Sequence, residues 1–478
     1  MGRLEDLDAD VARVFRYLGP EPENWVPATR GVARDVVIVG AGQSGLATAF
    51  ALKRKGVTNI SVIDAAVPGK AGVWLNTARM PTLRTPKAVA GPELGVFALS
   101  FQNWHETLHG AAAYATVKKI PRTTWAHYLE WFRATVGIKV RNRTRLLDIE
   151  PADGHFRLHL IEDGVARTET ARKVVLATGI AGCGAANIPR LLQDGLPASR
   201  YAHTSHPIQF DQFAGKVVAV LGSAASALDA AAAAVEAGAS AVHMFCRRRE
   251  LTGTWPGQAR SYPGAWDNYP QVPDADRWRL ERRIRQSGSQ PPREAVVRAA
   301  QLRNFHLHLG TPWTSVREAD GQVLITTPEE NFVADFVIAG TGFRVDPAAR
   351  PELHRVAEQI ALWRDRYTPP PEDEDAALGA YPYLGPGFQF QEKAAGRAPY
   401  LKDLHCFTSG ANLSFGRLIG DIPSLDGNVP RLAAAIIHDL FVADYAHHWR
   451  RMAAEVKPDF LEEDYAAAIW RGALAVAS

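Results

Sequence analysis

A short turn that contains three glycines is the part of this sequence whose residue types and spacing point most directly to chemistry. Residues 40–45 read G-A-G-Q-S-G and follow directly on the β-branched run at residues 35–40. In a G-x-G-x-x-G turn the glycines permit a tight turn, a close approach of the backbone to a diphosphate, and close packing of helix on strand. The following helix directs unpaired N–H groups and its positive dipole end at the phosphates. We therefore predict a dinucleotide site formed by Gly40, Gly42, Gln43, Ser44 and Gly45.

An acidic residue completes this first site. Residues 43–55 have a helical pattern that Gly56 ends, and Asp64 lies at the end of the strand expected at residues 59–65. A carboxylate at this point can accept hydrogen bonds from ribose hydroxyls. A glycine turn that binds no ligand is the less favoured interpretation, because the glycines, the helix and the acid occur together.

A second unit of the same kind occurs farther along the chain. Residues 216–221 predict a strand, residues 222–227 read G-S-A-A-S-A, and the next strand, residues 241–246, ends at three consecutive arginines. Guanidinium groups at this point can pair with a 2′-phosphate, so the second site should prefer NADPH to NADH. A solvated strand end is the alternative. The predicted residues of this site are Gly222, Ser223, Ala225, Ser226, Arg247 and Arg248.

Strand and helix patterns alternate along the chain, which is typical of the α/β class with largely parallel sheets. Further strands are expected at residues 139–150, 155–161, 173–179, 305–309, 322–327, 335–340 and 403–409, and further helices at residues 124–133, 276–285 and 429–439. An aromatic stretch at residues 255–269 could cover a substrate or pack on its own side chains.

Composition excludes several classes of protein. The 478 residues include 54 Lys and Arg and 51 Asp and Glu, so neither nucleic acid nor an anionic membrane is an expected partner. No apolar stretch reaches the roughly 18 residues of a membrane helix, and residues 1–25 do not resemble a signal peptide. The three cysteines, Cys183, Cys246 and Cys406, lie far apart in the sequence and predict neither a redox pair nor a metal site. We expect a cytoplasmic protein without a bound metal.

Shorter motifs extend the pattern into a family resemblance. Residues 71–74, A-G-V-W, resemble the G-G-x-W segment of the flavin-containing and Baeyer–Villiger monooxygenases, and residues 177–179 and 340–343 resemble the two A-T-G-type strand ends of that group. Residues 410–421, followed by a helix, are similar to the late segment that presents a helix end to the flavin. The sequence thus resembles the class B flavoprotein monooxygenases over roughly residues 35–440, although the family segment F-x-G-x-x-x-H matches chiefly at His203.

The resemblance implies an architecture and a reaction. It implies two Rossmann-like domains, with an NADPH domain at residues 206–334 inserted into a FAD domain made of residues 1–205 and 335–478. NADPH would reduce FAD, O2 would add at the flavin C4a carbon, and the peroxyflavin would pass one oxygen atom to a small substrate. It adds Val73, Trp74, Thr178, Gly179, Gly342 and Asp421 to the cofactor-binding residues. Arg84 is the predicted catalytic residue, orienting oxygen or substrate; an ion pair with an acid is the alternative.

Two other functions remain open at this point. An NADPH oxidase that releases hydrogen peroxide would use the same two sites, and a non-catalytic module could keep both folds without turnover. A disulfide reductase is disfavoured because the sequence predicts no cysteine pair beside the first unit. The substrate and the oligomeric state are not determined by these patterns.

Overall fold

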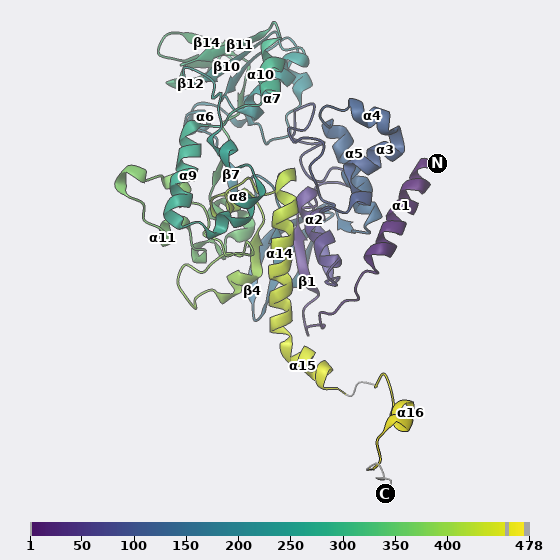
Figure 1. The fold of residues 1–478 in the computed structure, drawn as a ribbon. Coiled ribbons are helices and arrows are strands. Elements are labelled where there is room, and N and C mark those ends of the chain that lie inside the picture. The colour runs from purple at the N-terminus through teal and green to yellow at the C-terminus, as the bar shows by residue number, and fades with distance from the viewer. Residues whose placement is uncertain (1, 455–457, 473–478) are drawn as a thin grey trace.

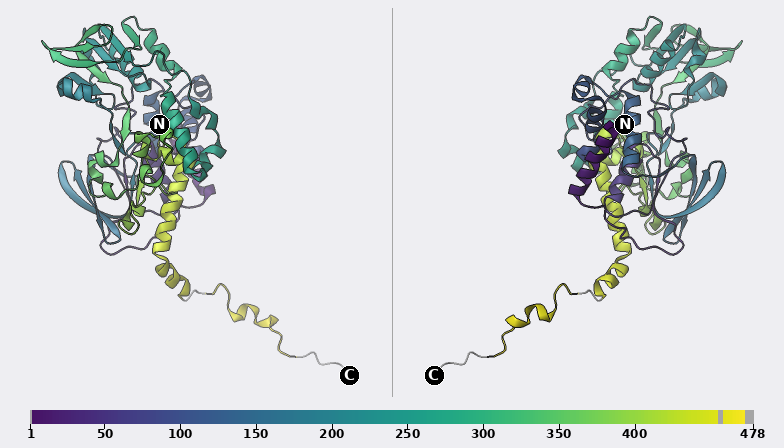
Figure 2. Two further views of the ribbon diagram at one scale, coloured as in Figure 1. Left: turned by 90° about the vertical axis from the view of Figure 1, so that its left-hand side faces the viewer. Right: turned by 90° about the vertical axis from the view of Figure 1, so that its right-hand side faces the viewer.

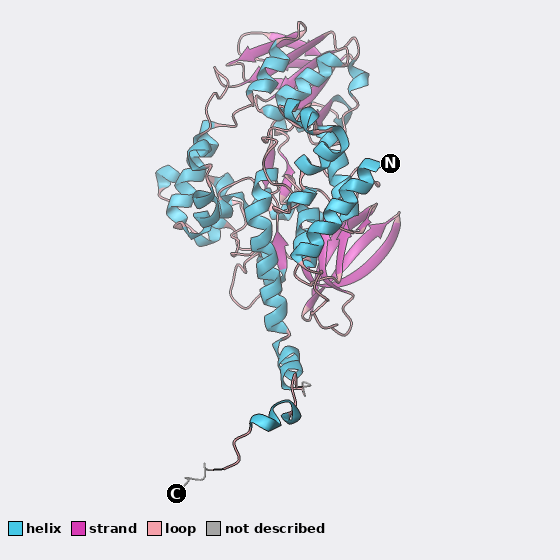
Figure 3. Ribbon diagram, turned by 45° about the vertical axis from the view of Figure 1, so that its right-hand side comes forward, coloured by secondary structure: helices cyan, strands magenta, loops and turns pink. Residues whose placement is uncertain are grey.

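The computed structural model describes residues 2–454 and 458–472. Its strands form two main sheets in separate parts of the molecule, with helices packed on and between them (Figures 1 and 3). The predicted α/β class is therefore confirmed. No helix in the described ranges is long and apolar enough to cross a membrane.

The first sheet is built around strands whose side chains are buried on both faces. Its order is β3-β2-β1-β6-β5-β4, and β17 pairs with β6. β1 pairs in parallel with β2 and β6, whereas β4, β5 and the first half of β6 form an antiparallel meander. The strands are β1 (Arg34–Val39), β2 (Ile60–Ile63), β3 (Val140–Arg141), β4 (Thr144–Ala152), β5 (His155–Glu162), β6 (Val165–Leu176) and β17 (Leu404–Cys406).

Helices cover this sheet and complete its hydrophobic core. The helices are α1 (Gly2–Leu18), α2 (Gln43–Lys53), α3 (Phe101–His109), α4 (Ala111–Thr116), α5 (Arg122–Thr135) and α14 (Ile422–Ala443). α14 packs along α2, as Figure 1 shows. α14 begins seven residues earlier than the predicted helix at 429–439, because the Asp421 carboxylate accepts a hydrogen bond of 2.9 Å from the Ser424 amide and caps it.

The second sheet is parallel throughout, in the order β11-β10-β9-β15-β8. Its strands are β8 (Tyr201–His203), β9 (Val217–Leu221), β10 (Ala241–Cys246), β11 (Phe305–Leu309) and β15 (Phe336–Ala339), with α7 (Ala225–Glu236) and α10 (Arg293–Ala300) packed against it. A meander of β12 (Ser315–Ala319), β13 (Gln322–Thr326) and β14 (Asn331–Ala334) packs nearby. β8 and β15 lie outside residues 206–334, so this sheet takes a strand from each side of the predicted insertion.

Two further parts of the chain surround these sheets. A layer of short helices includes α8 (Pro263–Asn268), α9 (Asp274–Ser287), α11 (Trp363–Arg366), α12 (Ala376–Gly379) and α13 (Asn412–Phe415). Strands β7 (Gly184–Ala186) and β16 (Phe343–Val345) pair beside this layer. α15 (Tyr445–Ala453) and α16 (Glu462–Tyr465) extend away from the body, as Figure 2 shows.

Two of the three cysteines lie close together in the fold. Cys183 and Cys406 lie far apart in the sequence, but both flank Gly410 in the fold. A Cβ on Gly410 would lie 2.7 Å from the Cys183 sulfur and 3.0 Å from the Cys406 sulfur. Both are buried free thiols, and the hydrogen bond with Cys406, together with burial, raises the pKa of Cys183 well above its ordinary value. β17 and the segment before β7 bring them together, which spacing in the sequence does not show.

A buried histidine predicts how stability depends on pH. Burial lowers the pKa of His405 to about 4, and its Nδ1 lies 2.8 Å from the Gly387 carbonyl oxygen. The unfolded chain takes up the proton near pH 6.5, so the free energy of unfolding should fall as pH decreases from about 6.5 to about 4. The full effect is on the order of 3 kcal/mol.

Chemical denaturation of wild-type and His405→Gln protein at pH 7.5 and pH 4.5 measures this term. The variant should lose less stability than wild type between the two pH values. Asp35, whose pKa burial raises to about 6, acts in the opposite direction but contributes equally to both proteins. Equal pH slopes in the two proteins would contradict the assignment to His405.

Candidate active site

The first glycine turn is held in shape by two of its glycines. Gly40 has φ +105°, and a Cβ there would lie 2.5 Å from the Ala177 carbonyl oxygen. A Cβ on Gly45 would lie 1.9 Å from the Gly40 carbonyl oxygen. By contrast, a Cβ on Gly42 would approach nothing closer than 3.5 Å. Gly40 and Gly45 thus close the turn, whereas Gly42 leaves free space beside the N-terminus of α2.

Asp64 ties this turn to the end of β2. One carboxylate oxygen accepts a hydrogen bond from the Ala41 amide and the other from the Ala66 amide, both at 2.8 Å. Each oxygen keeps a lone pair that can accept from a ribose hydroxyl. Asp64 therefore positions the turn and can also bind a nucleotide sugar.

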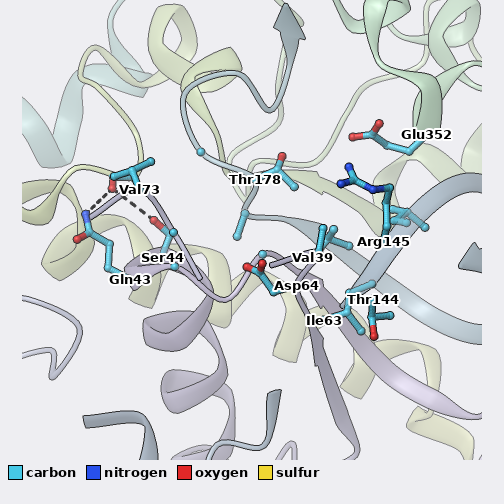
Figure 4. A pocket seen from close by; sticks show the side chains of 18 of the residues that line it. Val39, Gln43, Ser44, Ile63, Asp64, Val73, Thr144, Arg145, Thr178 and Glu352 are labelled. Carbon is cyan, nitrogen blue, oxygen red and sulfur yellow. Dashed lines mark hydrogen bonds between the residues drawn. The ribbon is translucent and has the colours of Figure 1, made fainter. Parts of the chain in front are cut away.

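A cavity of about 330 Å³ lies in front of the turn, at the carboxyl ends of the parallel strands (Figure 4). Ligands of open α/β sheets bind at this edge. The predicted residues that line the cavity are Gly40, Gly42, Gln43, Ser44, Asp64, Val73, Trp74, Thr178 and Gly179. The free space at Gly42, the N-terminus of α2 and the Asp64 carboxylate fit the diphosphate and ribose of a dinucleotide.

A contact between distant segments forms one wall of the cavity. The Gln43 side-chain amide donates to the Gly420 carbonyl oxygen at 2.8 Å, and the Ser44 hydroxyl donates to the same oxygen at 3.4 Å (Figure 4, dashed lines). Asp421 follows as the cap of α14, and burial raises the pKa of its carboxyl group. The loop before α14 is therefore fastened to the helix that begins at the glycine turn.

Sequence reasoning missed several lining residues. Thr144, Arg145, Leu146, Arg350 and Glu352 also line the cavity, whereas Gly420, another lining residue, falls inside the predicted segment 410–421. Thr144 and Arg145 begin β4 at the same edge of the sheet. Their position directly after β3 could therefore have indicated that they line the cavity. Glu352 lies in a short 3-10 helix, Pro351–Leu353, which Arg350 precedes, and neither residue carried a signal in the sequence. Of the predicted cofactor-binding residues of this site, Gly45, Gly342 and Asp421 do not line the cavity; Gly342 has φ +78° in an open turn.

The second turn, at the start of α7, has the same backbone form. Gly222 has φ +131°, and a Cβ there would lie 2.3 Å from the Gly340 carbonyl oxygen. Ser223 and Ala225 are partly exposed and Ser226 is exposed, so a ligand could reach this turn. Ala224 caps the helix without a side-chain hydrogen bond.

The arginines after β10 do not act alike. Arg248 donates to the carbonyl oxygens of Gln286 and Ser287, both at 2.9 Å, and so binds the C-terminal end of α9. This geometry does not favour the predicted phosphate contact of Arg248, because both of its terminal nitrogens already donate to the end of α9. Arg247 is exposed and remains the better candidate.

Arg84 does not line the cavity in front of the first turn. Its guanidinium pairs with Asp229 of α7 at 2.9 Å. Both residues line a second cavity of about 290 Å³, between the part of the chain that contains the first sheet and the part that contains the second. Arg298 approaches the same carboxylate at 3.4 Å. The ion-pair alternative therefore describes Arg84 here, and a catalytic role for it stays a prediction that this geometry does not favour.

Asp229 connects the two parts of the molecule that contain the main sheets, and removing its charge should lower the stability of the protein. Its side chain is only 5% exposed, and burial raises the pKa of its carboxyl group despite the two arginines. Asp229→Asn should lower the free energy of unfolding by on the order of 3 kcal/mol, because Arg84 would lose its carboxylate partner and Arg298 would keep only Glu236. Urea denaturation of wild-type and Asp229→Asn protein measures this difference in the free energy of unfolding.

Glu294→Gln is the matched control for this experiment. Glu294 pairs with Lys119 at 2.8 Å beside the same cavity but is exposed, so its loss should cost less than about 1 kcal/mol. Equal small effects of the two substitutions would contradict the bridging role of Asp229.

Comparison with known proteins places this site in a family. Residues 37–257 match the family described as pyridine nucleotide-disulphide oxidoreductase. The chain is 42% identical over 448 residues to the FAD-dependent urate hydroxylase of Xanthomonas campestris pv. campestris, covering 92% of this chain and 94% of that protein. The chain belongs to the flavoprotein monooxygenases.

Solved structures share the fold of this flavoprotein monooxygenase. Ornithine hydroxylase from Pseudomonas aeruginosa matches with a TM-score of 0.68 at 17% identity, over 86% of this chain and 100% of that one. Ornithine N-hydroxylase from Kutzneria sp. 744 matches with a TM-score of 0.65 at 17% identity, over 85% and 99%. These two structures show the shared fold, and the 42% identical relative confirms the predicted resemblance to the FAD-dependent flavoprotein monooxygenases.

Proposed function

We propose that this flavoprotein monooxygenase uses NADPH and O2 to hydroxylate a small planar heterocycle, with urate as the first candidate substrate. The observation that carries the proposal is the 42% identity, over nearly the whole chain, to a FAD-dependent urate hydroxylase. The open space at Gly42 in front of α2 supports the cofactor part of it.

The residues of the first cavity would hold FAD. The N-terminus of α2 and the backbone at Gly42 would bind the diphosphate, and Asp64 would accept from the ribose. When bound, FAD supplies two-electron chemistry with NADPH and the activation of O2. Trp74, half-buried in the cavity wall, would limit the access of water.

The contact of Gln43 and Ser44 with Gly420 would keep two walls of this site at a fixed separation. Because Gly420 precedes Asp421 and α14, the start of that helix is held against the same cavity. The turn that begins α7 would bind NADPH, with Arg247 near its 2′-phosphate.

To test this proposal, the protein is purified and supplied with FAD, and its NADPH consumption is measured with and without urate. The proposal expects a yellow protein, reduction by NADPH faster than by NADH, and NADPH consumption that urate stimulates. NADPH use matched one-for-one by hydrogen peroxide, whatever substrate is present, would instead support an oxidase. A colourless protein that takes up no FAD would support a non-catalytic module.

A further inference from the structure

One partly buried arginine lacks the partners that its neighbours have. Arg417 lies between α13 and α14, and its guanidinium stacks on the Trp266 ring at 4.3 Å from the ring centre. Among residues 2–454 and 458–472, the structure gives it no side-chain ion pair or hydrogen bond. Nearby, Arg282 pairs with Asp373 at 2.9 Å and Arg431 donates to the Asp267 carbonyl oxygen at 2.6 Å.

The absence of a partner is unusual because charged groups that leave water are normally paired. Burial lowers the pKa of Arg417, although Asp421, Asp267 and Asp426 act in the opposite direction. Its five N–H donors match a planar anion that offers two acceptors side by side. These three carboxylates act on the charge of Arg417, but none in the described part of the chain forms an ion pair with it, so its N–H donors remain available to such a ligand.

The surroundings hold Arg417 in one place. The preceding Gly416 has φ +74°, and a Cβ there would lie 2.4 Å from the Tyr269 ring, so the loop is pressed against the aromatic segment. Arg431 of α14 fastens that segment through Asp267. The stack on Trp266 fixes the plane of the guanidinium and leaves its edge available.

Arg417 also lies close along the chain to the cofactor cavity. It comes shortly before Gly420, which lines that cavity and accepts the hydrogen bond of Gln43. The aromatic segment around Trp266, which could be either a cover or a self-packed loop, is thus joined to the loop that forms a cavity wall.

We propose that Arg417, held by Trp266, binds the anionic edge of a planar heterocyclic substrate such as the urate anion. The guanidinium donates two parallel hydrogen bonds to neighbouring oxygen and nitrogen acceptors of the ring, next to the cofactor cavity. This inference rests on the proposed function, since it concerns the substrate of that site.

The test compares urate with fully N-methylated urate, which keeps the ring system but has no ionisable N–H. Binding to the FAD-loaded protein is measured by titration calorimetry, and turnover by NADPH consumption. Arg417→Gln should weaken urate binding and raise its KM roughly tenfold to a hundredfold, since charge-assisted paired hydrogen bonds are lost. Binding of the methylated compound and flavin reduction by NADPH should not change.

Two further variants make the result specific. Arg417→Lys keeps the charge but not the paired donors, so it should retain part of the preference for urate. Arg282→Gln removes an arginine that pairs with Asp373, outside the proposed contact, and should leave the KM for urate unchanged. If Arg417→Gln does not retain FAD or does not fold, the Lys variant decides the question.

Each outcome separates this inference from the proposed function. A wild-type KM for urate in Arg417→Gln, or equal losses for urate and the methylated compound, would overturn the anion site. A change in the KM for NADPH alone would indicate that Arg417 contacts the coenzyme, and would also overturn the anion site. Urate binding that depends on Arg417 but leads to no turnover would contradict the proposed function only, whereas wild-type protein that binds no urate would contradict both.

Discussion

Replacing Gly42 by valine is expected to give a folded protein that no longer retains FAD. Gly42 has φ −69° and ψ −179°, an extended conformation that valine adopts readily, and a Cβ there meets no atom closer than 3.5 Å. The side chain would instead fill the space left for the diphosphate. The charge-assisted hydrogen bonds from α2 to the diphosphate would be lost, each worth on the order of 1.5–3 kcal/mol. Their loss should weaken the affinity for FAD by at least ~100-fold.

Flavin absorbance per chain and circular dichroism measure retention and folding together. Gly253→Val is the matched control, because a Cβ on Gly253 would meet no atom within 4 Å and the residue lies outside the cavity. That control should keep its FAD. A Gly42→Val protein that carries a full complement of FAD would mean that the diphosphate does not bind at this turn.

Replacing Arg247 by alanine is expected to weaken the binding of NADPH and to leave the binding of NADH almost unaffected. Arg247 follows β10 and is exposed, where its guanidinium can pair with a 2′-phosphate that NADH lacks. Loss of that pair should raise the KM for NADPH by roughly tenfold to a hundredfold. Steady-state and stopped-flow reduction with each coenzyme measure the difference.

Arg248→Ala is the informative comparison for this prediction. Arg248 is engaged with the carbonyl oxygens of Gln286 and Ser287, so its loss should affect both coenzymes alike through the end of α9. A selective effect of Arg248 on NADPH, with none from Arg247, would reverse the assignment of the two residues.

The part of the fold that depends on local pattern was predictable from the sequence. β1, α2 and β2, and again β9, α7 and β10, lie close to their predicted ranges, because continuous apolar runs and glycine turns specify buried parallel strands and their connections. The lining residues from Gly40 to Asp64 followed from the same pattern.

What depends on long-range packing was not predictable. No local signal shows that Arg84 reaches Asp229 of α7, that Arg248 binds the end of α9, or that Cys183 lies beside Cys406. Each contact joins segments that are distant in the sequence. The start of α14 was missed for a different reason, because Pro423, Gly427 and Pro430 weaken the helical pattern that the Asp421 cap begins.

The proposed function depends on the coupling of NADPH oxidation to insertion of one oxygen atom into the substrate. The most direct measurement is turnover of FAD-loaded protein with urate and NADPH under ¹⁸O2, followed by mass spectrometry of the product and a parallel peroxide assay. We expect one labelled oxygen in the product for each NADPH consumed, with little peroxide. Product without label, or NADPH consumption fully recovered as hydrogen peroxide, would contradict it.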